Sequence, residues 1–261
     1  MNKITIYIQR WNSYMMKYLW GNVCFSAFIY WITLLVVKED VFIDGKATTS
    51  CLFAILMCNI WQGIFNSVSL FNNESSYIVD DINKFLPIRS YIIANFIIQF
   101  CLCLIESLIC TSLFMIFFDY SNTGLILPHR NLEYILTFFL VLLSCDTLSL
   151  AAGILIKKIN TIMSIIPIIL IVQFLFSGCL FDLSGIGKVI SKITTAKWGY
   201  EALGTISNVN SLSPVPGYED AMFTYTKSHL CHCWLVLILI ILACTMLAGL
   251  FLYFRMNKED N

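Results

Sequence analysis

The sequence predicts an all-α membrane protein with six transmembrane helices, and three observations support this. Apolar residues make up 59% of the 261 residues and the mean hydropathy is +0.80, while charged residues make up 12%, about half the usual share in a soluble domain. Of the 16 basic and 16 acidic residues, only Glu106 and Asp146 lie inside six long apolar stretches. Each stretch reaches the roughly 20 residues that a helix needs to cross the hydrocarbon core.

The six predicted spans form one domain, residues 18–255, which a short cytoplasmic tail, 256–261, follows. The spans are residues 18–37, 47–71, 90–118, 134–156, 159–181 and 230–254. Seventeen polar-interrupted residues precede the first span, so we expect it to stay as an anchor and not to be cleaved as a signal peptide. The connector between spans four and five is minimal, which predicts that these two helices are antiparallel neighbours.

Residues 1–17 carry apolar side chains at helical spacing, with Lys3, Arg10 and Lys17 repeating at every seventh position on another face. This pattern predicts an amphipathic helix that lies at the cytoplasmic membrane interface. The alternative is a plain cytoplasmic extension of the first span.

The segment between spans two and three, residues 72–89, is longer than a simple connector requires. It combines charged side chains with apolar ones at near-helical spacing, and Pro87 ends the pattern. The candidate contact residues here are Glu74, Asp80, Asp81, Lys84 and Phe85. We predict a short amphipathic helix that a cytoplasmic partner grips, with a solvated connector as the alternative.

Residues 182–229 form the longest loop, and its first half is unusually apolar. Ile186, Val189, Ile190 and Ile193 recur at helical spacing, and Trp198, Tyr200 and Leu203 follow. Such a pattern predicts short helices that dip back into the outer leaflet or cap the bundle.

Basic residues predict the orientation of the chain. Nine Lys and Arg residues fall on the side of both termini and seven on the other side, four of them in the long loop. Because short segments weigh most in the positive-inside rule, both termini are predicted to face the cytoplasm of a multi-pass cell-membrane protein. The neutral net charge and the absence of basic runs argue against a nucleic-acid partner.

The eleven cysteines lie mostly within apolar stretches, where a thiol acts as a small apolar side chain. A disulfide between Cys179 and either Cys231 or Cys233 stays open. His229, Cys231, His232 and Cys233 are the one cluster with metal-ligand chemistry, but no second ligand pair is near in the sequence. We therefore expect an ordinary helix start there and no metal.

Two segments resemble the membrane subunit of ABC exporters of the type-2 class (ABC-2 type permeases), particularly the branch near the G-subfamily half-transporters. Trp198-Gly199-Tyr200-Glu201, followed by Ala-Leu, is similar to the signature of the exterior re-entrant region in that family. The stretch from Gly63 through the acidic segment to Ser90-Tyr91 and Ala94-Asn95 resembles the family's entry into its third helix.

The resemblance implies the permease half of an exporter that pairs with a cytoplasmic ABC ATPase and with a second permease, as a homodimer or heterodimer. The printed sequence has no Gly-x-x-x-x-Gly-Lys-Ser/Thr loop. No cofactor is therefore expected on this chain, and ATP and Mg²⁺ are expected on the partner. We predict a transport subunit without catalytic residues, and the resemblance implies a bacterial plasma membrane.

The candidate substrate path combines residues from spans two to five, namely Asn59, Gln62, Glu106, Asp146, Gln173 and Phe174. The resemblance implies that spans two and five line the central cavity, which makes Asn59, Gln62, Gln173 and Phe174 candidates for substrate contact, while interhelical hydrogen bonding is the alternative for the amides. Pro167 is expected to kink span five. An apolar, weakly polar path suits amphipathic peptides, lipids or hydrophobic drugs alike.

Glu106 and Asp146 are predicted near the middle of spans three and four, where a charge costs at least about 2.5 kcal/mol. They are either a proton-relay or substrate-cation site, or structural carboxyl groups bonded to neighbours such as Ser107, Thr111, Ser144 or Thr147. The first alternative corresponds to a secondary transporter or channel that needs no ATPase.

Overall fold

The computed structural model describes residues 3–37, 40–84, 88–156, 159–181, 183–213 and 220–259. Within these ranges the chain folds into eight α-helices and two short 3-10 helices, with no β-strand. The helices are α1 (Lys3–Val36), α2 (Gly45–Lys84), α3 (Ile88–Phe117), α4 (Arg130–Leu155), α5 (Ile159–Leu175), α6 (Gly185–Ser191), α7 (Thr195–Ile206) and α8 (Lys227–Glu259). The all-helical class predicted from the sequence is confirmed.

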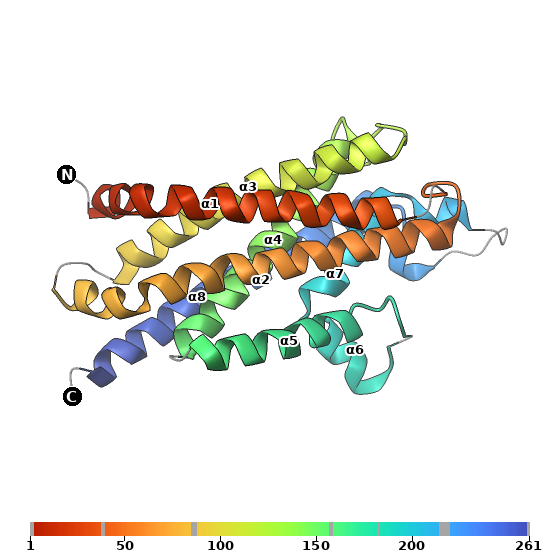
Figure 1. Cartoon of the computed structure of the whole chain (residues 1–261). Helices are drawn as coiled ribbons and strands as arrows, with labels where there is room; N and C mark the ends of the chain where they lie inside the picture. Colours follow the sequence, from red (N-terminus) through yellow and green to blue (C-terminus); the bar gives the residue numbers. More distant parts are fainter. Residues whose placement is uncertain are drawn as a thin grey trace.

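The long helices lie side by side along one direction (Figure 1). Both chain termini, the carboxyl end of α2 and the amino end of α3 lie at one end of the bundle. Helices α6 and α7 lie toward the other end. This arrangement agrees with the sequence-based assignment of both termini to one side.

Four helical segments in the described part of the chain are long and apolar enough to cross a membrane. They are Gly45–Ser67, Ile92–Phe117, Arg130–Leu155 and Lys227–Phe254. Two shorter apolar segments, Trp20–Val36 and Asn160–Leu175, coincide with the first and fifth predicted spans. The chain is therefore a multi-pass membrane protein with at least four spans, and the count of six stays a prediction.

The first two helices are longer than the sequence pattern indicated. The backbone is one helix from Lys3 to Val36, so the segment 1–17 and the first span are not separated by a break in the described part. Likewise α2 continues to Lys84, thirteen residues past the predicted end at position 71, which adds about 20 Å of helix. The predicted helix after span two is thus the continuation of α2 itself.

The fifth helix is shorter than predicted. The sequence placed a span over 159–181, but α5 ends at Leu175 and Pro167 lies inside it. Gly178 adopts φ +84°, a left-handed conformation that a continuing helix cannot contain. Hydropathy alone missed this end because Cys179, Leu180 and Phe181 remain apolar.

Helix α4 is the centre of the bundle. It contacts α2, α3, α5, α7 and α8, and most of its residues are buried. The predicted contact between spans four and five is therefore present, although α5 also contacts α2 and α7. Two side-chain bonds tie α4 to its neighbours: Ser149 Oγ donates to the Ile64 carbonyl at 2.6 Å, and Trp234 Nε1 of α8 donates to Thr137 Oγ1 at 2.9 Å.

Glycine allows α2 to approach α4 closely. A Cβ atom added to Gly63 would lie 2.6 Å from the Leu142 carbonyl oxygen and 2.9 Å from Cys145 Cβ. Both distances are well below ordinary van der Waals contact, so no other residue fits this crossing without a backbone shift.

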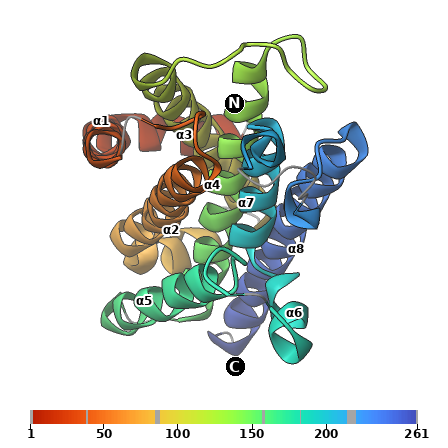
Figure 2. The same cartoon turned by 90° about the vertical axis from the view of Figure 1, so that its right-hand side faces the viewer.

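The long loop contains two short helices of different character. Ile186, Val189 and Ile193, in and just after α6, are 62–79% exposed, whereas almost every residue of α7 is buried. Figure 2 shows α7 beside α4 and α8, with α6 farther out. The sequence pattern thus located both helices, while their predicted re-entry into the membrane stays a prediction.

Candidate functional site

A buried polar cluster joins α2, α3 and α4 at the middle of the bundle. Glu106 on α3 is fully buried, and each of its oxygens accepts a hydrogen bond from an amide on α2. Gln62 Nε2 donates to Oε1 at 3.0 Å, and Asn66 Nδ2 donates to Oε2 at 2.7 Å. Gln62 also donates to Asn66 Oδ1 at 3.0 Å, so the three side chains form one connected network.

Asp146 on α4 enters the same cluster through Ser67. Ser67 Oγ donates to Asp146 Oδ1 at 2.7 Å and accepts a hydrogen bond from Gln99 Nε2. Asp146 Oδ2 has no partner within the described residues, although Asp146 is fully buried. Since Asn66 and Ser67 are adjacent in α2, that helix links the two carboxyl groups, and Asp146 keeps one oxygen free for a proton or water.

The partners of the two acids differ from those predicted. The sequence suggested Ser107, Thr111, Ser144 and Thr147, but these hydroxyl groups donate to backbone carbonyls three or four residues earlier in their own helices. A hydroxyl inside a helix finds that acceptor without any neighbouring helix. The prediction was wrong because the interhelical partners are the α2 side chains Gln62, Asn66 and Ser67.

Two other predicted path residues also lie in helix contacts. Asn59 is fully buried and accepts a hydrogen bond from Tyr30 Oη at 3.1 Å, which joins α1 to α2. Gln173 Oε1 accepts from the Ala196 amide at 2.9 Å, which joins α5 to the first turn of α7. Their contact with a substrate stays a prediction.

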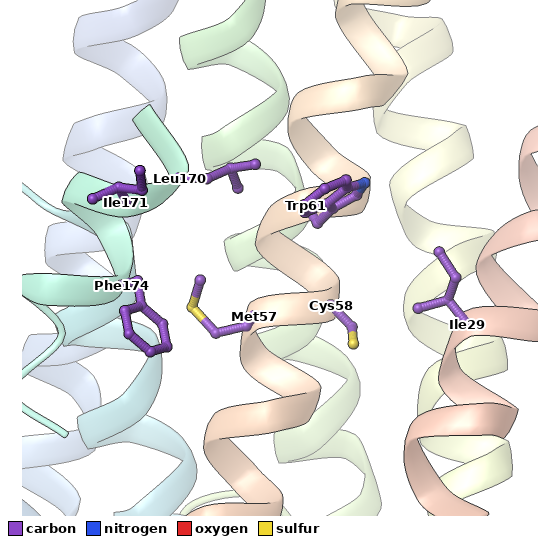
Figure 3. A pocket seen from close by; sticks show the side chains of 7 residues that line it. All are labelled: Ile29, Met57, Cys58, Trp61, Leu170, Ile171 and Phe174. Atoms are coloured by element: carbon purple, nitrogen blue, oxygen red, sulfur yellow. The ribbon is translucent and has the colours of Figure 1, made fainter. Parts of the chain in front are cut away.

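An apolar groove of about 390 Å³ lies between α1, α2 and α5. Its lining residues are Ile29, Met57, Cys58, Trp61, Leu170, Ile171 and Phe174. Figure 3 shows the α5 side chains on one side of α2 and Ile29 of α1 on the other, with Met57 turned toward α5. Of the predicted path residues, Phe174 is the one that lines this groove.

Aromatic contacts connect the groove to α7. Phe53 of α2 has its ring centroid 5.3 Å from that of Phe174 and 5.6 Å from that of Tyr200. The Tyr200 ring in turn meets Phe223 edge-on at 5.2 Å. A movement of α5 at Phe174 would therefore displace the Phe53 ring, which contacts Tyr200 on α7.

The segment Trp198 to Glu201 is the inner part of α7. Trp198 Nε1 donates to the Lys192 carbonyl at 2.9 Å, which fixes the turn between α6 and α7. A Cβ on Gly199 would lie 2.7 Å from Leu56 Cδ1 and 2.8 Å from Val141 Cγ2, so the glycine lets α7 press against α2 and α4.

Glu201 is buried to 7% exposure and pairs with Lys197 one turn earlier, with Nζ 3.7 Å from Oε1. Burial raises the pKa of this carboxyl group above its ordinary value, and the ammonium of Lys197 offsets only part of that shift.

All eleven cysteines are free thiols, so the open question of a disulfide from Cys179 to Cys231 or Cys233 is answered against one.

The predicted coupling residues lie at the end of α2. Glu74, Asp80, Asp81 and Lys84 are within the helix, and Phe85 lies outside the described residues. The end of α2 lies at the same end of the bundle as both termini (Figure 1).

Several residues of these sites were not among the predicted ones. Asn66 and Gln99 carried a signal as polar residues in apolar helices, but nothing in the sequence paired them with Glu106 and Ser67. Serine is common in such helices, so Ser67 did not stand out. The groove residues look like ordinary lipid-facing side chains; they are Ile29, Met57, Trp61 and Ile171. Their roles depend on how the helices are rotated against one another.

A bundle of apolar helices with buried acids, an apolar groove and a capping helix defines a polytopic membrane transport protein. The family profile described as ABC-2 type transporter matches residues 4–206. The chain belongs to this family, which confirms the resemblance seen in the sequence. It is a permease component of a transporter, and membership implies an ABC ATPase as partner in general.

No curated protein matches the chain with significance. The transported substrate is therefore inferred from the groove and the helices alone.

Proposed function

We propose that the chain is the permease half of an ATP-driven exporter for amphipathic or hydrophobic molecules. Six spans, with both termini in the cytoplasm of a plasma membrane, form one half, and a second permease of the same or a related sequence forms the other. ATP and Mg²⁺ bind to the separate ABC ATPase. The groove lined by α1, α2 and α5 supports this proposal most directly, because it is almost purely apolar and opens on the outer face of the helices.

The groove sets the chemistry of the substrate. Its volume of about 390 Å³ is in the range of small-molecule sites. Trp61 stacks on Phe65 with centroids 5.3 Å apart, and Phe174 lines the groove from α5 with Met57 turned toward it (Figure 3), so flat apolar groups find aromatic contacts. An acyl chain, an apolar peptide side chain or an aromatic drug fits this lining.

The groove also offers a way to couple substrate binding to movement. Alternating access requires α2 and α5 to shift relative to each other, and both helices line the groove. The uninterrupted α2 would transmit force from an ATPase at its carboxyl end to Met57, Cys58 and Trp61. The capping helix α7, reached through Phe53 and Tyr200, would respond at the outer exit.

A bulky residue in the groove is expected to weaken transport. Replacing Ile171 with Trp fills the space between α5 and α2, and we expect about a tenfold rise in the substrate KM, or about 1.4 kcal/mol of lost binding. The measurement is ATP-dependent uptake of a fluorescent amphipathic probe into inside-out vesicles that contain the permease and its ATPase. Such uptake also tests the outward direction in the cell.

Ile168→Trp is the matched control for this substitution. Ile168 lies one turn earlier on α5 and is similarly exposed, at 58% against 55% for Ile171, but it does not line the groove. Equal loss of uptake in the two variants would contradict the groove as the substrate site.

Charge reversal at the end of α2 is expected to uncouple ATP hydrolysis from transport. In the double variant Asp80→Lys and Asp81→Lys, we expect transport to fall about tenfold or more while basal ATPase activity remains. The physical reason is that two lysines would face the basic surface of the ATPase that the two aspartates are proposed to contact, and like charges repel. Asp119→Lys, an exposed acid in the α3–α4 loop, is the control. Normal coupling in the double variant would rule out contact between these acids and the ATPase.

The buried acids keep a secondary transporter as a second candidate. Asp146 Oδ2 has no partner in the described structure, and Asp146 and Glu106 bond to the adjacent α2 residues Ser67 and Asn66, which places two proton-binding groups next to each other in the bundle. Transport by the purified chain without any ATPase would favour this second function.

A further inference from the structure

We propose that Glu201, His229 and Cys233 bind a Zn²⁺ ion that joins α7 to the start of α8. One ligand atom from each residue lies within 4.8 Å of the others. Cys233 Sγ is 3.9 Å from Glu201 Oε2 and 3.9 Å from His229 Nε2. A carboxylate, an imidazole and a thiol thus converge on one point.

The helices explain why these three residues meet. His229 and Cys233 are four residues apart in the first turns of α8, so their side chains share one face of that helix. Glu201 comes from the middle of α7, which packs against α8 (Figure 2). Cys231 and His232 are exposed and fall outside the convergent group, although they belong to the same Cys- and His-rich segment.

The spacing suits a tetrahedral ion. With Zn–S near 2.3 Å and Zn–N or Zn–O near 2.1 Å, ligand atoms around tetrahedral zinc are separated by about 3.5 Å. Two of the three separations, both 3.9 Å, exceed this by a few tenths of an ångström, and the third, between Glu201 and His229, is within 4.8 Å. Binding of the ion would therefore require side-chain rotations that draw Glu201 and His229 closer together.

The surroundings leave one side of the site open. Cys233 is fully buried and Glu201 nearly so, while His229 is partly exposed. His229 Nε2 lies 3.1 Å from the Met222 carbonyl oxygen, which holds the ring at the site until the metal replaces this hydrogen bond. Three protein ligands leave the fourth position to a water molecule that enters beside His229.

The ligand charges also suit a divalent cation. Lys197 contacts Glu201 Oε1, so Oε2 remains directed at the thiol. A carboxylate and a thiolate together offset the charge of Zn²⁺, while the Lys197 ammonium stays paired with the second carboxylate oxygen. The mixture of sulfur, nitrogen and oxygen ligands is typical of zinc, whereas Mg²⁺ and Ca²⁺ prefer oxygen alone.

Zinc at this position would act as a clamp between the capping helix and the last span. Glu201 ends the Trp198–Glu201 segment, which contacts α2 and α4 through Gly199. The ion would hold α7 against the bundle where only a weak Sγ contact now joins Glu201 to Cys233.

Zinc binding is tested on the purified full-length chain in lipid nanodiscs after removal of metal with a chelator. Competition with a chromophoric zinc indicator is expected to give one Zn²⁺ per chain. Glu201→Gln, His229→Ala and Cys233→Ser are each expected to weaken binding more than about 100-fold, since even the loss of a residue that only supports a metal ligand costs about 10- to 100-fold. Cys231→Ser and His232→Ala are the matched controls and are expected to bind as the parent does.

A second measurement starts from the parent chain, so its main result does not depend on a variant that folds. Co²⁺ bound to the parent chain is expected to show the intense visible bands of a tetrahedral ion and a thiolate-to-cobalt charge-transfer band. The charge-transfer band is expected to persist in Cys231→Ser and to vanish in Cys233→Ser. Absence of stoichiometric zinc, a cobalt spectrum without the thiolate band, or equal loss in the Cys231→Ser and His232→Ala controls would overturn the proposal.

Discussion

Replacing Gly63 with Leu is expected to abolish the folded protein, and Gly63→Ala is expected to destabilise it by about 2 kcal/mol. The first added carbon already lies 2.6 Å from the Leu142 carbonyl oxygen, and a backbone atom cannot turn aside as a side chain can. Overpacking of a close contact costs about 1–3 kcal/mol and sometimes more. This exceeds the roughly 1 kcal/mol that alanine gains over glycine within a helix. The measurement is the melting temperature and the monodisperse fraction in detergent.

Gly21→Ala is the control for the packing argument. Gly21 also lies within a helix, α1, but no atom outside its own helix lies within 4 Å of an added Cβ. The same substitution should therefore be neutral or slightly stabilising there. A Gly63→Ala variant that melts at the parent temperature would show that α2 and α4 can separate without cost.

Replacing Glu106 with Leu is expected to cost about 2–5 kcal/mol of stability. The substitution leaves one N–H of Gln62 and one of Asn66 without an acceptor in the middle of the bundle, and each unsatisfied buried group costs about 1–3 kcal/mol. Glu106→Gln keeps the shape and one of the two acceptor oxygens but turns an NH2 group toward the other donor, so we expect a smaller cost of about 1–2 kcal/mol. Thermal unfolding in nanodiscs measures both. Ser112→Leu, on the exposed face of α3, is the control and should leave the melting temperature unchanged.

The same site separates the two candidate functions. In an ATP-driven permease, the double variant Glu106→Gln and Asp146→Asn should keep its fold and most of its ATP-dependent transport. In a proton-coupled transporter, removing both proton-binding groups would stop transport although the protein remains folded. Loss of ATP-dependent transport in a folded double variant would therefore contradict a purely structural role for the two acids.

The sequence identified the two buried acids of the candidate site but not their hydrogen-bond partners. Glu106 and Asp146 stood out because ionisable groups are expensive in a membrane, and this reasoning needs no neighbour. Their hydrogen-bond partners lie 40 and 79 positions away in the chain, and both come from α2. The sequence suggested nearer hydroxyl groups, which bond within their own helices instead.

The His- and Cys-rich start of α8 gives a second case. The sequence contained His229 and Cys233 but no second ligand pair nearby, so no metal was expected. The third ligand, Glu201, lies 28 positions before His229 and reaches it only because α7 packs beside α8. Glu201 also belongs to the Trp198–Glu201 motif, which the resemblance assigned to the exterior re-entrant region.

The sequence by itself determined that this chain is a helical membrane protein, because hydropathy, helix length and the need to satisfy backbone groups in lipid are properties of each segment alone. Its resemblance to ABC-2 type permeases came from two short motifs, and the family profile confirmed it. It also located most helices to within a few residues, apart from the ends of α2 and α5. Only the tertiary structure decided which faces of these helices meet. The rotation and crossing of packed helices bring Glu106 to Asn66, Ile171 to Met57 and Glu201 to Cys233, and such contacts leave no periodic trace in the chain.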